Sequence, residues 1–306
     1  MKNTFKCFLG LILICATFSC AKEKEEEQDD KGNRQNHNVS KKSKSENLNI
    51  SFLLDLSDRI NPRKYPNETM EYYMRDAAYI KSVSEAFTTY VRVKKISQMN
   101  EKIQMFFEPA PKNKNINSIS ENLKFEITKK TASLELLNDL ENAYSTSSAE
   151  IYKLAIEDNK YVGSDIWGFF KNKVKDYCIE EDHRNILVVL TDGYNYHEAY
   201  KRTEGNRTTF ITPQTIRDFK LNKPDWEDRY VENEYGFIPA ARGLENLEVL
   251  VLGINPDPKN PYEGDVIKTY WSDWLESMDV KRYSIKNADL PSNMDGIIKD
   301  FVLGKS

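Results

Sequence analysis

Two short apolar runs that end in acidic loops dominate the hydrophobic and polar pattern of this chain. One is Phe52-Leu53-Leu54, which leads directly into Asp55, and the other spans 186–190 and leads through Thr191 into Asp192. A continuous apolar run of this length is typical of a parallel strand that is buried on both faces. Ligands of open α/β sheets bind beyond the carboxyl ends of the strands, so we expect the two aspartates to converge at one crevice.

The rest of the folded part alternates between helical and strand patterns. Apolar residues at three- and four-residue spacing predict helices over 70–91, 132–157, 166–177, 266–278 and 294–303, and short apolar runs predict further strands over 104–107, 247–252 and 280–285. The segment 123–127 alternates apolar and polar residues, as an antiparallel edge strand does. This order predicts an α/β fold: a doubly wound, mostly parallel sheet with helices on both faces.

A long insertion, about 194–245, interrupts this rhythm directly after the strand that ends before Asp192. It is rich in Asn, Thr, Tyr and charged residues. Long insertions at the end of a strand often determine specificity, so we expect this one to shape the binding surface. Tyr194, Tyr196 and Tyr200 follow the aspartate closely and are candidates for partner contacts, because tyrosine is enriched at interfaces; packing within the insertion is the alternative.

The amino-terminal residues predict export and attachment to a membrane. Residues 1–19 have a basic start and an apolar stretch too short to span a bilayer, as signal peptides do. The following Cys20 lies in a sequence that resembles the lipobox of bacterial lipoproteins, although Thr17 and Phe18 depart from that pattern, and ordinary cleavage is the alternative.

Lipidation of Cys20 implies an outer-membrane lipoprotein of the bacterial cell envelope, facing either the periplasm or the cell surface. The stretch 20–47 is highly charged and almost free of apolar residues, which predicts a flexible tether, and 48–306 forms the folded domain. The acidic cluster behind Cys20 resembles the export tag of surface-displayed lipoproteins, or is a solvated linker.

Composition excludes two classes of protein. The net charge is −4, which lacks the basic field expected of a nucleic-acid binder. Of the four cysteines, only Cys20 and Cys178 follow the signal peptide, so the fold does not depend on a disulfide framework. Cys178 lies on the apolar side of its predicted helix and is expected in the core.

With these motifs in their strand and helix contexts, residues 48–303 resemble the von Willebrand factor A domain. That family has a metal-ion-dependent adhesion site formed by an Asp-x-Ser-x-Ser motif, a Thr in a middle loop and a later Asp. Asp55 and Ser57 match the first motif, Ser164 stands for the Thr, and Asp192 is the last aspartate. The resemblance implies that these four residues bind Mg²⁺ or Mn²⁺, hard cations that prefer oxygen ligands. The alternative roles are helix caps and turn hydroxyls.

One position departs from that pattern, because Arg59 stands where the family has its second Ser. Two interpretations are open. Arg59 points outward, and Asp58 or water fills the place of the missing hydroxyl. Alternatively, Arg59 replaces the ion and pairs with Asp55 or Asp192, since a guanidinium group matches carboxylates in a bidentate manner.

The resemblance implies a protein-binding module in which a carboxylate of a partner protein completes the metal coordination. No chemical step is needed, and the membrane is contacted through the lipid anchor alone. A metal-free domain that acts as a structural part of an envelope complex is the alternative. A metal-dependent hydrolase or phosphatase that uses the two aspartates is a further, less favoured alternative. We do not expect an enzyme, because the sequence shows no Asp-x-Asp pair, glycine-rich phosphate loop or Ser-His pair.

Overall fold

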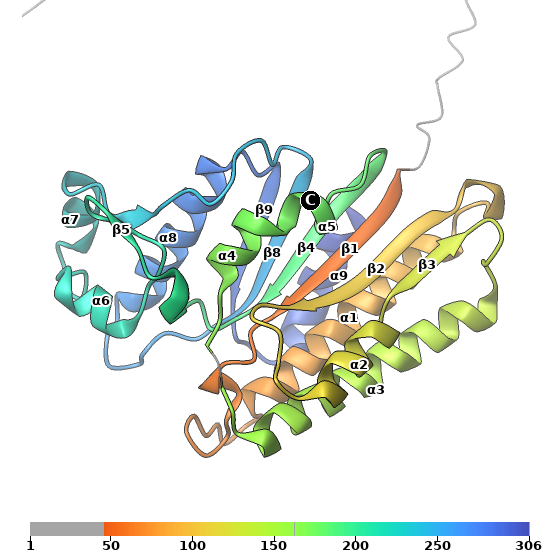
Figure 1. Ribbon diagram of the computed structural model, residues 1–306, viewed down its shortest axis with the longest axis horizontal. Helices are drawn as coiled ribbons and strands as arrows, with labels where there is room; N and C mark the ends of the chain where they lie inside the picture. The colour runs from red at the N-terminus through yellow and green to blue at the C-terminus, as the bar shows by residue number, and fades with distance from the viewer. Residues whose placement is uncertain (1–45, 162, 306) are drawn as a thin grey trace, which may run out of the picture. The chain divides into compact units, whose positions relative to one another are not determined.

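A six-stranded sheet forms the centre of the part of the chain that the computed structural model describes, residues 46–161 and 163–305 (Figure 1). Its strand order is β3-β2-β1-β4-β8-β9, and neighbouring strands are parallel except for the antiparallel pair β2 and β3. The strands are β1 (Asn47–Leu54), β2 (Asn100–Phe107), β3 (Phe125–Thr128), β4 (His183–Leu190), β8 (Leu247–Ile254) and β9 (Arg282–Asn287). The predicted doubly wound, mostly parallel sheet with an antiparallel edge strand is confirmed.

The predicted signal peptide, Cys20 and nearly all of the tether lie outside the described residues. Within the described residues, no helix combines the length and the apolar character that crossing a membrane requires.

Each central strand contributes side chains to two separate hydrophobic cores. In β4, Ile186 and Val188 pack into one core, whereas Leu187 and Val189 pack into the other. Successive side chains of a strand point to opposite faces of the sheet, so an unbroken apolar run requires cover on both sides. The apolar runs of the sequence therefore specify a sheet that lies between two layers of helices.

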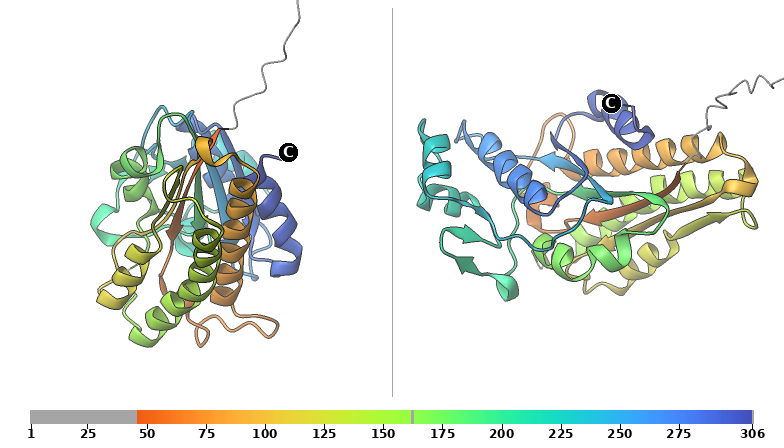
Figure 2. Two further views of the ribbon diagram at one scale, coloured as in Figure 1. Left: turned by 90° about the vertical axis from the view of Figure 1, so that its right-hand side faces the viewer. Right: turned by 90° about the horizontal axis from the view of Figure 1, so that it is seen from above.

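Helices cover both faces of the sheet (Figure 2). The helices of the first face are α1 (Tyr72–Arg92), α2 (Lys114–Asn122), α3 (Leu134–Asp158) and α9 (Pro291–Leu303). Those of the second are α4 (Ile166–Asn172), α5 (Val174–Cys178) and α8 (Glu263–Ser277). Cys178 is fully buried in the second core, as predicted.

The prediction of one continuous helix over 166–177 is wrong. The backbone of Lys173, with φ −130° and ψ −30°, leaves the helical region and separates α4 from α5. The break turns α5 so that Val174 and Cys178 pack on the sheet, while Tyr177 is 53% exposed. Helix α2 was not predicted, because it is short and places only Ile116 in the core.

The insertion folds as a small unit on the second face. It contains the strands β5 (Thr203–Glu204), β6 (Arg207–Thr208) and β7 (Gly236–Phe237) and the helices α6 (Pro213–Asp218) and α7 (Trp226–Glu232). Two indoles of α8 attach the segment to the main domain. Trp271 Nε1 donates to the carbonyl of Gly193 at 2.9 Å, and Trp274 Nε1 donates to that of Ile238 at 3.1 Å.

Candidate functional site

The candidate site lies where the winding of the sheet reverses. From β1 the chain proceeds to β2 on one side, whereas from β4 it proceeds to β8 on the other, so the carboxyl ends of β1 and β4 form the topological switch point. Backbone hydrogen bonds connect the loops there: Asp55 N donates to Leu190 O and Thr191 N to Leu252 O, each at 3.0 Å. The structure thus places Asp55 and Asp192 on adjacent loops.

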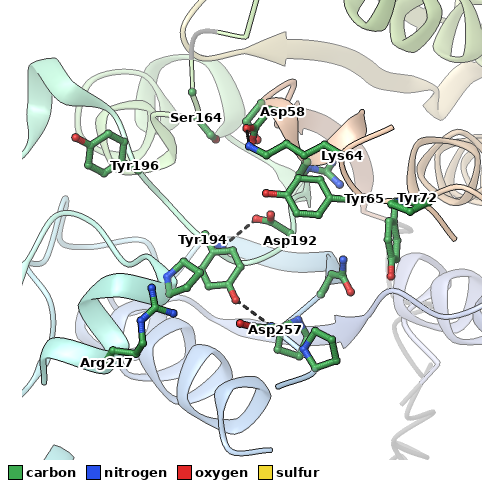
Figure 3. A pocket seen from close by; sticks show the side chains of 18 residues that line it. Asp58, Lys64, Tyr65, Tyr72, Ser164, Asp192, Tyr194, Tyr196, Arg217 and Asp257 are labelled. Atoms are coloured by element: carbon green, nitrogen blue, oxygen red, sulfur yellow. Dashed lines mark hydrogen bonds and ion pairs between the residues drawn. The ribbon is translucent and has the colours of Figure 1, made fainter. Parts of the chain in front are cut away.

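A pocket of about 820 Å³ opens beyond these strand ends (Figure 3). Its volume is in the range of sites that bind small molecules or side chains of a partner. Seven of the predicted site residues line it: Ser57, Asp58, Arg59, Ser164, Asp192, Tyr194 and Tyr196. Asp55 and Tyr200 do not line it, and Tyr200 is 44% exposed.

Asp55 is buried behind the pocket and its carboxylate has local partners. Oδ1 accepts from the backbone N–H of Ser57 at 2.9 Å, and Oδ2 accepts from the hydroxyl of Thr191 at 3.0 Å. These bonds hold the first loop against the loop that carries Asp192. In this arrangement Asp55 shapes the site, and its carboxylate does not face the pocket.

Arg59 points into the protein, so the interpretation in which it points outward is wrong. The residue is only 5% exposed, and its Nη2 donates to Asp76 Oδ2 at 2.6 Å and to Leu190 O at 3.0 Å. Its Nε donates to the backbone oxygen of Asp55 at 3.2 Å and lies 3.5 Å from Asp55 Oδ2. Burial alone would lower the pKa of Arg59, but Asp76 and Asp55 raise it, so the guanidinium stays charged.

The main partner of Arg59 is Asp76 of α1, which was not among the predicted site residues. Asp76 is buried, and its Oδ2 also accepts from the hydroxyl of Tyr152 of α3 at 3.1 Å. Burial raises the pKa of Asp76, an effect that Arg59 opposes. The sequence does contain a signal for it, because Asp76 lies three and four positions before Tyr79 and Ile80, on the apolar side of the predicted helix.

Asp192 has no such cationic partner. Its Oδ1 accepts from the backbone N–H of Tyr194 at 3.1 Å, and within residues 46–161 and 163–305 no Lys, Arg or His lies at ion-pair distance from it. Burial, followed by the neighbouring carboxylate of Asp55, raises the pKa of Asp192 to about 7. Figure 3 shows its side chain at the centre of the pocket. Asp192 is therefore a carboxylate of the pocket without an ion-pair partner among the described residues.

The middle loop brings Ser164 to the pocket without using it as a helix cap. Asp165 caps α4, since its Oδ1 accepts from Gly168 N at 2.8 Å. Gly163 has φ +82°, and a Cβ there would lie 2.8 Å from Tyr196 O, so this position requires glycine. The close approach lets Ser164 N donate to Tyr196 O at 3.3 Å, which joins the loop to the insertion.

Hydrogen bonds fix the orientation of the aromatic wall. The hydroxyl of Tyr194 donates to the buried carboxylate of Glu263 in α8 and accepts from Asp257 N at 3.2 Å. Asn195, which the sequence analysis did not single out, accepts from Ile166 N at 3.0 Å and donates to Thr209 O at 2.7 Å. The insertion therefore presents Tyr194 to the pocket from a braced segment.

The donor set fits a divalent cation poorly. Ser57 and Ser164 line the pocket together with three aspartates, Asp58, Asp192 and Asp257. Asp58 is paired with Lys64, and Asp55, behind the pocket, is engaged with Thr191 and Arg59. Arg59 also lines the pocket, and the charge of its buried guanidinium group would repel a metal ion held nearby. Among the described residues, no group of three or more His, Cys, Asp or Glu is arranged to hold a metal ion.

Comparisons with known proteins add little to this geometry. No family model matches the chain, and no curated protein matches it. Among solved structures, the pilus adhesin SpaC of Lactobacillus rhamnosus GG is 11% identical, with 84% of this chain and 30% of the adhesin covered and a TM-score of 0.41. BatB of Bacteroides thetaiotaomicron is 12% identical, with 85% and 100% covered and a TM-score of 0.36.

An aerotolerance-related membrane protein of Bacteroides fragilis is 10% identical, with 83% of this chain and 98% of that protein covered and a TM-score of 0.36. The chain thus spans less than a third of the adhesin but nearly the full length of the two Bacteroides proteins. Functional conclusions for this chain rest on the site itself.

Proposed function

We propose that this chain is an envelope-anchored protein-binding module whose binding site is the pocket at the switch point, and that Arg59 takes the place of a divalent cation there. The observation that supports this is the position of Arg59 between Asp76 and Asp55, with both carboxylates within 3.5 Å of its nitrogens. The buried guanidinium group supplies a positive charge that offsets the repulsion between the carboxylates at this end of the sheet.

The same observation supports a proposal for the charge of the partner. A bound metal ion would attract a carboxylate. With Arg59 in ion pairs with Asp76 and Asp55, however, the pocket carboxylates without an ion-pair partner among the described residues are Asp192 and Asp257. The partner group is therefore a cation, the side chain of a lysine or an arginine. Tyr194 and Tyr196 on the pocket wall suit such a group, because cations are attracted to the faces of aromatic rings.

In this proposal, capture of the partner involves no chemical step. The described side chains that line the pocket include no His or Cys that would serve as a general base or nucleophile beside a serine. Ser57 and Ser164 act as hydrogen-bond donors and acceptors for the incoming group.

Calorimetric titration of the purified full chain tests the proposal. The probes are the tripeptides Gly-Lys-Gly, Gly-Arg-Gly and Gly-Glu-Gly, each with and without MgCl₂ or MnCl₂. We expect the two basic tripeptides to bind independently of metal and Asp192→Asn to weaken the binding roughly thirtyfold. Binding of Gly-Glu-Gly that requires Mg²⁺ would contradict the proposal and support a metal site. No binding of any probe would favour the structural role over the binding role.

Arg59→Ser supplies a matched variant, because it restores the hydroxyl that the resemblance implies. We expect Mg²⁺ to bind this variant and raise its melting temperature, and to leave the parent unchanged. Equal stabilisation of both proteins by Mg²⁺ would show that Arg59 does not take the place of the ion.

The anchor is proposed from residues outside the described ones. Labelling of the expressed chain with radioactive palmitate is expected to be lost in Cys20→Ala, and membrane fractionation is expected to place the parent in the outer membrane. Unlabelled, soluble parent protein would exclude the anchor while leaving the binding site to be tested separately.

A further inference from the structure

A second cluster of reactive groups lies at the opposite end of the sheet from the pocket. Lys94 follows the end of α1, close to the point where β1 and β2 begin side by side (Figure 1). Its side chain is 3% exposed, and the side chain of its ion-pair partner Glu101 in β2 is 0% exposed. Among the described residues, no other lysine ion pair has both side chains buried to this degree.

An asparagine side chain completes this cluster. Lys94 Nζ contacts the carboxylate of Glu101, donates to Asn47 Oδ1 at 3.0 Å and donates to Glu46 O at 3.2 Å. The other oxygen of Glu101 accepts from Asn100 N at 3.0 Å. A buried amine thus touches both a carboxamide and a carboxyl group, in a place from which water is largely excluded.

The Lys94 amine and the Asn47 carboxamide are the two reactants needed to form a new amide bond, and the Glu101 carboxyl group is the acid that this reaction needs. The amine must be neutral to attack, the amide carbon must be polarised by an acid, and the leaving nitrogen must receive a proton. Glu101 contacts Lys94 and can take its proton directly, and in the proposal it returns a proton toward Asn47, which contacts the same Lys94 Nζ. Burial raises the pKa of Glu101, and this favours the protonated carboxyl group that must act as the acid toward the amide.

We propose that Lys94 and Asn47 are joined by an intramolecular isopeptide bond formed with the help of Glu101. The Lys94 ammonium gives a proton to Glu101, and the neutral Nζ attacks Asn47 Cγ. The Nζ–Cγ bond forms, the Cγ–Nδ2 bond breaks, and Nδ2 leaves as ammonia. Of the two protons that the Lys94 ammonium loses, one completes the ammonia and the other remains on Glu101. No oxidant, reductant or further reactant is consumed.

The bond would link the first residue of β1 to the end of α1. In the proposed anchored protein, a force applied through the tether would act on the domain at Asn47. It would separate β1 from the sheet, beginning at the first residue of the strand. A covalent link to Lys94 passes that force to α1 as well. This mechanical role rests on the proposed anchor, whereas the bond itself does not, so each can fail separately.

Peptide mapping of the purified full chain by trypsin and mass spectrometry tests the bond. Trypsin does not cut after an acylated lysine, so the sequence predicts a branched species in which the peptide 45–59 is attached to 93–95 and the mass of one ammonia molecule is missing. In a folded parent protein, recovery of 45–59 and the cleaved peptide ending at Lys94 in full yield would overturn the proposal.

Variants separate the roles of the three residues. Lys94→Arg and Asn47→Ala are expected to abolish the branched species, and Lys102→Arg, at an exposed ion pair with Glu180 nearby, is expected to retain it. Asn47→Asp is expected to give a branched species of the same mass by loss of water instead of ammonia. Glu101→Gln is expected to fold without the bond; a bond formed at the parent rate in this variant would refute the role of Glu101.

Discussion

The two ends of the central sheet each contain a buried cluster of charged groups, and the clusters differ in how they are completed. At the amino end, Glu248 of β8 accepts from Arg184 of β4 at 2.8 Å and from Arg282 of β9 at 2.7 Å. The remaining donors reach the carbonyls of Phe301 and Val302 at the end of α9. This cluster has more cations than carboxylates, and the polypeptide satisfies the surplus itself.

At the carboxyl end the balance is reversed. One guanidinium, Arg59, serves Asp76 and Asp55, and Asp192 is left with a backbone N–H. The pKa values follow this difference. Although burial opposes it, the guanidinium groups around Glu248 lower its pKa, whereas burial and Asp55 raise that of Asp192. A self-sufficient cluster stabilises the fold, and an incomplete one at a pocket is suited to receive a charge from outside.

The largest effect on stability is expected from Arg59→Met. It leaves Asp76 and Asp55 buried without a counter-charge, which costs about 3 to 5 kcal/mol of the free energy of unfolding. Urea denaturation followed by circular dichroism measures it. The double variant Arg59→Met, Asp76→Leu is expected to recover much of the loss. A single variant as stable as the parent would show that the acidic cluster needs no cation.

A smaller loss, about 2 kcal/mol, is expected from Glu248→Gln, because hydrogen bonds to charged groups contribute roughly this much. Since the pKa of Glu248 is lowered in the folded protein, its stabilisation is present above the ordinary glutamate range and disappears as the pH falls through the folded value. Urea titrations of parent and variant at a series of acidic pH values should converge. Tripeptide binding is expected to stay unchanged in this variant.

Asp192→Asn is expected to act on binding and to leave the fold intact. Loss of a charge-assisted contact weakens the binding of Gly-Lys-Gly by about 2 kcal/mol, or roughly thirtyfold, measured by calorimetry. Asp58→Asn is a matched control, because Asp58 lines the same pocket but is paired with Lys64. Equal losses in both variants would show that the pocket recognises overall charge and not Asp192.

The smallest effect is a dependence on pH. Because the pKa of Asp192 is raised to about 7, binding of Gly-Lys-Gly should strengthen as the pH rises through 7. The effect on stability has the opposite sign. The contribution of Asp192 to stability is fully present below the pKa of the unfolded chain, about 4, and it is lost as the pH rises toward the pKa of the folded protein. Stability of the parent relative to Asp192→Asn, measured from pH 4 to 8, should therefore decline.

Much of the fold and the position of the pocket follow from local patterns. The apolar run before Asp192 needs cover on both faces, and an Asp at the end of such a strand must lie at the edge where the parallel strands end. The break at Lys173 was not predicted, because the apolar spacing of 166–177 suits one continuous helix and the reason for the break lies in packing on the sheet.

The sequence by itself determined the α/β architecture and the two loops that meet at its switch point, because both depend on the spacing and length of apolar runs. Tertiary structure alone decided the direction of Arg59 and the isolation of Asp192. The partner of Arg59 is Asp76, seventeen residues later on a helix, and that helix must pack on the sheet before the two charges meet. The local pattern indicates only that Asp76 lies on the apolar side of its helix; its pairing with Arg59 depends on distances across the core, which no local pattern encodes.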